Sequence, residues 1–274
     1  MGRDHPWPGR ERRRVIPVAL TIAGSDPSGG AGLQADLKTF HQFGVYGEAV
    51  VTLVTVQNTR RVSRVEIMDP ALIREQIEAV IEDIPPGAIK IGALGDAGVI
   101  AAVAAFAFAA PLVVDPVMIS KHGVPLLAPA AVDALRQRLL PLATLLTPNL
   151  PEAEVLTGIG IQSLADARRA AAALLAMGPR AVLIKGGHFT HTATDLLLTA
   201  DGVERLYPAE HIDTQHTHGS GCTYSAAITA ELAKGTELGE AVARAKAFIA
   251  AAIATNPGLG GGSGPVNHHA RIRG

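Results

Sequence analysis

A glycine-rich turn that leads into an apolar helical segment holds the only cysteine of the chain. The turn is T-H-G-S-G-C-T, residues 217–223, and the helical segment runs from Tyr224 to Leu232. Free backbone N–H groups at a helix start converge on one point and the helix dipole adds positive charge there, so the turn suits a phosphate. Cys222 lies inside it, where a thiolate would be favoured and could act as a base. The alternative is an ordinary helix start with a cysteine that packs as a small hydrophobe.

Asn149 and Glu152 stand at a predicted strand-to-helix junction, with Pro151 at the first turn of the helix. Two interpretations are open. The pair could cap the helix, with the acidic residue favoured by the helix dipole. It could instead organise a hydrated Mg²⁺ beside phosphates, because Mg²⁺ keeps its waters and uses few protein ligands. Asp115, which ends a central apolar strand, could share that metal-binding role.

Lys185 ends another apolar strand, V-L-I-K, and precedes two glycines. A lysine at a strand end can simply extend its amine to solvent. Combined with an anion-binding turn elsewhere, it could bind a phosphate as a point charge. An anion-binding turn, a cation, a metal-binding carboxylate and a possible base are together the components of a phosphoryl-transfer site.

The segment G-S-D-P-S-G-G-A-G, residues 24–32, resembles a phosphate-binding loop. It lacks the lysine of G-x-x-x-x-G-K-[ST], and it is not a clean G-x-G-x-x-G. We therefore favour a loop that lets the backbone approach a small substrate. Asp36 follows Gly32 by four residues on the predicted first helix, where the alternative is an exposed helix carboxylate.

Short β-branched segments alternate with Ala- and Leu-rich segments of helical periodicity, and these elements must position the residues above. The predicted strands are 18–24, 49–56, 88–91, 112–115, 145–147, 181–185, 195–199 and 202–207. The predicted helices are about 31–43, 70–83, 97–109, 129–140, 151–157, 163–177, 220–234 and 237–255. This alternation implies a parallel sheet with helices on both faces. The last two strands form an antiparallel hairpin at one edge. Ligands bind at the carboxyl ends of such strands, where the candidate residues stand.

The composition favours small-molecule chemistry. With 48% hydrophobic and 18% charged residues in 274, the chain can bury a large core, and its net charge of -1 does not attract nucleic acid or anionic lipid. One cysteine excludes an internal disulfide and fits a reducing compartment, so we expect a cytoplasmic protein. Apolar runs fall short of the ~20 residues of a membrane span. Residues 1–15 contain an arginine run but no following A-x-A cleavage site, which predicts a disordered leader before one domain at 16–274.

Six segments resemble, in order, motifs of the hydroxymethylpyrimidine/phosphomethylpyrimidine kinase family, the thiamine-pathway branch of the ribokinase-like superfamily. They are A-L-T-I-A-G-S-D-P-S-G-G-A-G-L-Q-A-D-L-K-T-F, V-T-V-Q-N-T, V-V-D-P-V-M, L-L-T-P-N-L-P-E-A-E, L-I-K-G-G-H and T-H-G-S-G-C-T. The cysteine in the last turn separates this family from sugar kinases, which carry Asp in a G-A-G-D turn. The resemblance implies a three-layer α/β/α fold with a mostly parallel sheet. It also implies ATP-dependent phosphorylation of 4-amino-5-hydroxymethyl-2-methylpyrimidine, and then of its monophosphate, in thiamine biosynthesis.

The resemblance also implies roles for individual residues. The substrate would contact Gln57, through the pyrimidine edge, and Gly24, Asp36 and Val117. The residues that would bind ATP are Asn149, Glu152, Lys185, Thr217 and Gly219. Asp115 and Glu152 would bind the Mg²⁺. Cys222 would be the base, Lys185 would act in catalysis, and Gly219, Ser220, Gly221 and Cys222 would form the anion hole. Residues 120–127 would form a flap that closes over the pyrimidine and excludes water.

The chain departs from the common family pattern at Ala93, where many relatives carry Met in K-I-G-M-L; the smaller side chain could enlarge the substrate pocket. The nearest alternative function is a pyridoxal/pyridoxine kinase of the same superfamily. Gln57 favours the pyrimidine, because its amide offers a donor and an acceptor to an aminopyrimidine edge. A sugar or nucleoside kinase and a non-catalytic binding module are more distant alternatives. The family implies a homodimer.

Overall fold

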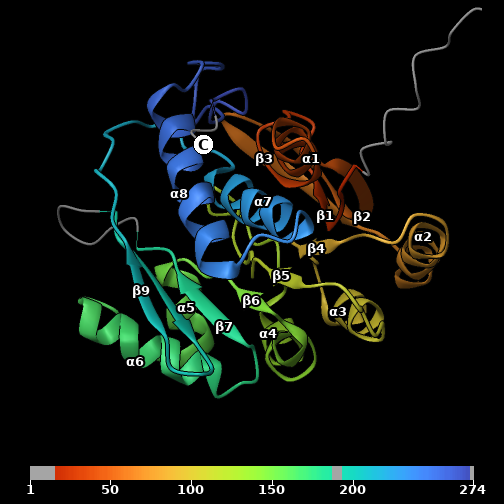
Figure 1. The fold of residues 1–274 in the computed structure, drawn as a ribbon. Coiled ribbons are helices and arrows are strands. Elements are labelled where there is room, and N and C mark those ends of the chain that lie inside the picture. Colours follow the sequence, from red (N-terminus) through yellow and green to blue (C-terminus); the bar gives the residue numbers. More distant parts are fainter. Residues whose placement is uncertain (1–15, 187–192, 272–274) are drawn as a thin grey trace, which may run out of the picture.

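The computed structural model of the chain describes residues 16–186 and 193–271. The predicted leader at 1–15, and Gly187 and His188 of the L-I-K-G-G-H motif, lie outside these residues. Within them, nine strands form one sheet in the order β3-β2-β1-β4-β5-β6-β7-β8-β9 (Figure 1). The strands are β1 (Val18–Ser25), β2 (Tyr46–Asn58), β3 (Arg61–Ile67), β4 (Ala88–Ile91), β5 (Leu112–Val114), β6 (Leu145–Leu146), β7 (Ala181–Ile184), β8 (Asp195–Thr199) and β9 (Glu204–Tyr207).

Helices cover both faces of the sheet, as Figure 1 shows. They are α1 (Gly32–Gln42), α2 (Pro70–Asp83), α3 (Ala97–Ala104), α4 (Val132–Ala134), α5 (Leu150–Thr157), α6 (Leu164–Leu175), α7 (Ser220–Ala233) and α8 (Leu238–Ala254). One apolar core lies between the sheet and α2, α3, α5 and α6, and a second lies between the sheet and α1, α7 and α8. The central strands β4, β5 and β7 are buried at every position, as strands covered on both faces require. The predicted three-layer α/β/α fold is confirmed.

The sheet is parallel from β2 to β7 and antiparallel at both edges. The predicted antiparallel hairpin is β8–β9. A second hairpin, β2–β3, was not predicted, and β2 is longer at both ends than the predicted strand. Ser63 is an extra residue in β3, because Val56 pairs with Arg64 whereas Gln57 pairs with Val62. Such a bulge interrupts the alternation of apolar and polar residues by which an edge strand is recognised.

Two predicted helices differ from the structure. The helix expected at 97–109 ends at Ala104. The segment expected as one helix at 129–140 is irregular: a 3₁₀ turn precedes the short α4, and a wider π-type turn and a second 3₁₀ turn follow it, up to Leu142. Pro141 lies in the last of these turns, where its ring prevents continuation of a regular helix. In the part of the chain that the structure describes, no helix has the length and apolar character needed to span a membrane.

Candidate active site

Two glycine-rich segments interlock at the carboxyl end of the sheet: the loop after β1 and the turn before α7. Asp26 in the first loop accepts a hydrogen bond from His218 Nε2 in the second at 2.8 Å, and both side chains are buried. Gly219 has φ of 75°, and a Cβ there would lie 1.8 Å from the carbonyl oxygen of Gly30. Only glycine therefore fits at position 219, and the anion-binding turn is held against the first loop.

The pKa of Asp26 is lowered to about 2. Burial alone would raise this pKa, but the hydrogen bonds and charge of His218, with the hydroxyl and N–H of Ser28, outweigh it. Asp26 also accepts backbone N–H bonds from Gly30 and Ala31 at 3.1 and 2.9 Å. The ionised carboxylate of Asp26 thus organises the whole first loop.

The turn before α7 lies over the predicted phosphate-binding cation. Lys185 Nζ donates to Asp115 Oδ1 at 2.7 Å, and a Cβ on Gly221 would be only 3.4 Å from that Nζ. Ser225 Oγ, one turn into α7, donates to the other Asp115 oxygen at 3.1 Å. Burial would raise the pKa of Asp115, but Lys185 and Lys90 outweigh it and the pKa is lowered. The structure therefore brings Lys185, Asp115 and the anion-binding turn together.

The other predicted residues of this turn are half-buried. Ser220 is the first residue of α7, and its N–H donates to the carbonyl oxygen of Thr217 at 3.2 Å. Within residues 16–186 and 193–271, no side chain caps this helix start, whose N-cap is Gly219. The first N–H groups of α7 are therefore free of side-chain capping, which suits an anion at this end of the helix.

Asn149 and Glu152 form a capping box at the start of α5. The Asn149 side chain accepts the Glu152 N–H and Glu152 Oε2 accepts the Asn149 N–H, each at 2.8 Å. The capping interpretation is confirmed, whereas the Mg²⁺ interpretation stays a prediction. The backbone of Asn149 also pairs with that of Lys185, so the two predicted ATP residues are neighbours.

Burial and the charge of Asp115 raise the pKa of Glu152 to about 7, although Lys185 opposes this shift. A divalent cation would favour the ionised form of such a carboxylate, so the donor set fits Mg²⁺. Among the described residues, no cluster of three or more His, Cys, Asp or Glu side chains could hold a metal ion. A magnesium ion held by Glu152 and Asp115 would thus take its remaining ligands from ATP and water.

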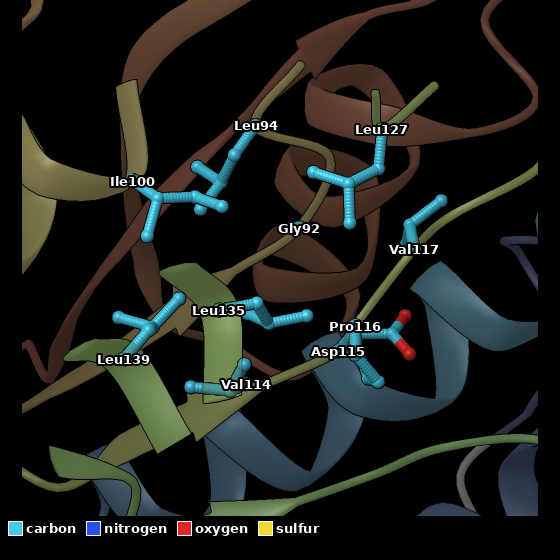
Figure 2. Close-up of a pocket in the computed structure, with 10 residues that line it drawn as sticks. All are labelled: Gly92, Leu94, Ile100, Val114, Asp115, Pro116, Val117, Leu127, Leu135 and Leu139. Atoms are coloured by element: carbon cyan, nitrogen blue, oxygen red, sulfur yellow. The ribbon is translucent and has the colours of Figure 1, made fainter. Parts of the chain in front are cut away.

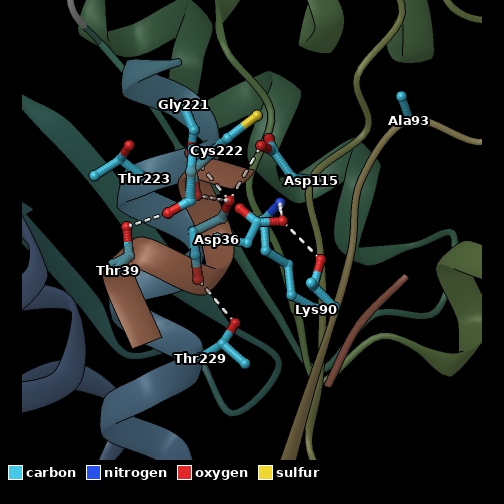
Figure 3. A network of polar contacts seen from close by, with 12 residues as sticks. Asp36, Thr39, Lys90, Ala93, Asp115, Gly221, Cys222, Thr223 and Thr229 are labelled. Carbon is cyan, nitrogen blue, oxygen red and sulfur yellow. Dashed lines mark hydrogen bonds and ion pairs between the residues drawn. The ribbon is translucent and has the colours of Figure 1, made fainter. Parts of the chain in front are cut away.

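Cys222 lies at the start of α7 with Asp36, Lys90 and Asp115 around it (Figure 3). The expectation that this position favours the thiolate is wrong: the pKa of Cys222 is raised to about 11. Burial is the main cause, and the carboxylates of Asp36 and Asp115 add to it. Lys90 and the backbone N–H of Gly32 lower the pKa but do not compensate.

Asp36 lies in the interior and not on the exposed face of α1. Its Oδ2 accepts hydrogen bonds from Lys90 Nζ at 2.8 Å and Thr21 Oγ1 at 2.6 Å, and all three side chains are fully buried. The alternative of an exposed helix carboxylate is therefore wrong. The predicted substrate contact of Asp36 is untested, and its hydrogen bonds run to the protein interior. Sequence reasoning missed Lys90, although a lysine within the apolar strand A-I-K-I was the available signal.

The predicted substrate residues lie at the ends of three strands. Gln57 is half-buried near the end of β2. Gly24 precedes the last residue of β1 and lies so close to β2 that a Cβ there would be 2.5 Å from Leu53 Cδ1. Val117 and Asp115 both line a small pocket (Figure 2). The other residues that line this pocket are mostly apolar. Ala93 is buried, and its carbonyl oxygen accepts a bond from Thr52 Oγ1 at 2.6 Å.

Residues 120–127, the predicted flap, form a tight loop above this region. The N–H of Gly123 donates to the Ser120 carbonyl oxygen at 3.0 Å, and Leu127 donates to Met118 at 3.1 Å. His122 at its tip donates from Nε2 to the carbonyl oxygen of Thr59, in the β2–β3 turn, at 3.0 Å. This contact joins the flap to the end of β2, next to Gln57. The β2–β3 hairpin and the contact that His122 makes with it were not predicted from the sequence, and closure of the flap over a substrate stays a prediction.

Comparison with known proteins agrees with this geometry. A family model described as phosphomethylpyrimidine kinase matches residues 26–267. A hydroxymethylpyrimidine/phosphomethylpyrimidine kinase from Haemophilus influenzae is 50% identical over 265 residues, which cover 94% of this chain and 98% of the relative.

Solved structures of two kinds resemble the chain. A phosphomethylpyrimidine kinase from Clostridium difficile matches with a TM-score of 0.75 and 46% identity, over 85% of this chain and 97% of that one. A pyridoxal kinase from Staphylococcus aureus, in complex with AMP-PCP and pyridoxal, matches with a TM-score of 0.85 and 36% identity, over 93% and 95%.

Proposed function

The chain belongs to the phosphomethylpyrimidine kinase family, and we propose that it phosphorylates 4-amino-5-hydroxymethyl-2-methylpyrimidine with ATP and then converts the monophosphate to the diphosphate, in thiamine biosynthesis. The observation that carries the proposal is the position of the α7 turn over Lys185 and Asp115. This arrangement directs the N–H groups of a helix start and one lysine at the same point, as transfer of a phosphoryl group requires.

The two phosphorylation steps place different chemical requirements on the same site. In the first step the nucleophile is an alkyl hydroxyl, which benefits from a base that takes its proton, and Cys222 Sγ would accept it. In the second step the nucleophile is a phosphate oxygen that is already ionised near neutral pH, so positioning and charge neutralisation are enough. Cys222 would therefore matter mainly to the first step.

Lys185 and the N–H groups of Gly219 to Cys222 would stabilise the transferred phosphoryl group in both steps. Glu152 and Asp115 would hold Mg²⁺, which would neutralise charge on the ATP phosphates. Asn149 would position the nucleotide phosphates through its place beside Lys185. The acceptor would lie under the flap, between Gln57 and Val117, with Gly24 contributing backbone contacts.

Pyridoxal phosphorylation is the second candidate, because a pyridoxal kinase matches the chain over 93% of its length. Gln57 supports the pyrimidine as the main substrate, since a carboxamide can pair with the amino group and ring nitrogen of an aminopyrimidine. The resemblance further predicts a homodimer in the cytoplasm. Light scattering after size-exclusion chromatography would measure the number of subunits.

The substrate assignment is tested by measuring kcat/KM with ATP and Mg²⁺ for hydroxymethylpyrimidine and for pyridoxal. A higher value for the pyrimidine supports the proposal. Turnover of pyridoxal alone would transfer the assignment to a pyridoxal kinase, and Ala93→Met would then show whether the smaller residue is responsible. Turnover of neither compound would contradict both assignments.

A further inference from the structure

The ion pair between Lys90 and Asp36 is completely buried, at 0% exposure for each side chain. A buried ion pair of this kind contributes little to the free energy of folding, because the cost of removing both charges from water is about as large as the gain from their attraction. Apolar residues of similar volume often serve a core equally well. The pair lies directly among the residues around Cys222 (Figure 3), which suggests a role in the site.

The pair anchors the start of α1. Asp36 follows Gly32 by four residues, so the two lie on the same face of the helix, one turn apart. The backbone N–H of Gly32 acts on the Cys222 sulfur and favours its ionised form. A bond from Lys90 to Asp36 on the next turn therefore fixes the orientation of the Gly32 N–H. Gly32 itself cannot shift freely, since a Cβ there would lie 2.2 Å from the Gly24 carbonyl oxygen.

Charged groups act on Cys222 from four elements. Lys90 lies on β4, Asp36 on α1, Asp115 after β5 and Lys185 after β7. The two carboxylates oppose proton loss from the thiol, and the two lysines favour it. Lys185 is bonded to Asp115 and faces the anion-binding turn, so a bound phosphate would partly neutralise it. Burial would lower the pKa of the Lys90 amine, but the charge of Asp36 outweighs this effect and the pKa is raised, so the fully buried lysine stays charged beside Cys222.

We propose that the Lys90–Asp36 pair is a positioning device for Cys222, which holds the first turn of α1 against the sulfur and places a permanent positive charge beneath it. Lys90 acts through Asp36 and through space, without touching the substrate. One oxygen of Asp36 has no hydrogen-bond partner among the described residues, so its carboxylate depends on Lys90 and Thr21 for its position. The inference deepens the proposed function, because it concerns the base of the first step.

The reactivity of the thiol tests this inference directly, because Cys222 is the only cysteine of the chain. The rate of alkylation by iodoacetamide would be measured on the full chain from about pH 7 to about pH 10, without ATP or pyrimidine. We expect Lys90→Met to lower the rate at about pH 8 by at least about tenfold, equivalent to one unit of pKa. The matched control is Lys246→Met, which removes another buried lysine–aspartate pair, with Asp195 at 2.7 Å, and should leave the rate unchanged.

If Lys90→Met does not fold, the double variant Lys90→Met/Asp36→Asn removes both charges and is the better tolerated change. It should alkylate more slowly than the wild type but faster than Lys90→Met, because Asp36 opposes proton loss from the thiol and Lys90 outweighs it. Wild-type alkylation rates in a folded variant would overturn the inference, as would an equal loss in Lys246→Met. Because alkylation requires no turnover, this outcome is independent of whether hydroxymethylpyrimidine is the substrate.

Discussion

The raised pKa of Cys222 predicts how the first phosphorylation depends on pH. With a pKa of about 11, the thiol is four units above neutrality, so about one molecule in 10⁴ carries a thiolate at pH ~7. Forming that thiolate costs about 5 kcal/mol at this pH, at 1.36 kcal/mol for each unit. The thiolate fraction rises with pH, and the rate of the first step should rise about tenfold per unit until the pKa is reached.

Replacing Cys222 with alanine should remove this dependence. We expect Cys222→Ala to slow the first step by about 10²–10⁴, the usual contribution of a positioned base, and to change the second step much less. Initial rates would be measured over the pH series with hydroxymethylpyrimidine and, separately, with its monophosphate. The second step is the internal control, because both steps use Lys185 and the same ATP. Equal losses in both steps, or a flat wild-type profile for the first, would refute the role of Cys222 as a base.

Three further predictions concern the parts of the site that hold the phosphoryl group and the loops. Lys185→Met should slow both steps by about 10²–10³, because both develop charge beside this amine; rates measured as above would check it, and a loss in one step only would contradict it. Gly219→Ala should lower the free energy of unfolding in urea by more than Gly235→Ala does. Both glycines have positive φ, a backbone conformation that costs an alanine about 1–2 kcal/mol. A Cβ at 219 would also meet the Gly30 carbonyl oxygen, whereas a Cβ at 235 would meet no described atom within 4 Å. Asp26 has a pKa lowered from 3.8 to about 2, so it should contribute about 2 kcal/mol above pH ~4, which is lost as the pH falls through about 2. Unfolding of Asp26→Asn should therefore be less sensitive to acid than that of the wild type.

Most of the fold was predictable because the central strands carry strong local signals. L-V-V and A-V-L-I are short apolar runs, and the helices between them have clear apolar faces. The exception is β3, whose seven residues are largely exposed, with three of them charged, and whose alternation is broken by the bulge at Ser63. An edge strand of this kind gains its structure from pairing with β2, which a local pattern cannot show.

The site was predictable where residues stand at strand ends, as with Lys185, Asp115 and the turn that contains Cys222. It was not predictable where function depends on burial. Burial of the Cys222 thiol, with smaller contributions from the charges of Asp36 and Asp115, reverses the expected effect of the helix start on its pKa. The role of Lys90 also depends on burial, and it could not be predicted because its partner, Asp36, lies 54 positions away along the chain.

The central claim is that one site performs two successive phosphoryl transfers. The most direct test is a time course with the wild-type protein, ATP, Mg²⁺ and hydroxymethylpyrimidine, in which chromatography resolves the monophosphate from the diphosphate. We expect the monophosphate to appear first and then to be consumed as the diphosphate forms, and we expect Lys185→Met to slow the formation of both. Accumulation of the monophosphate with no diphosphate, or a variant that loses only one product, would contradict it.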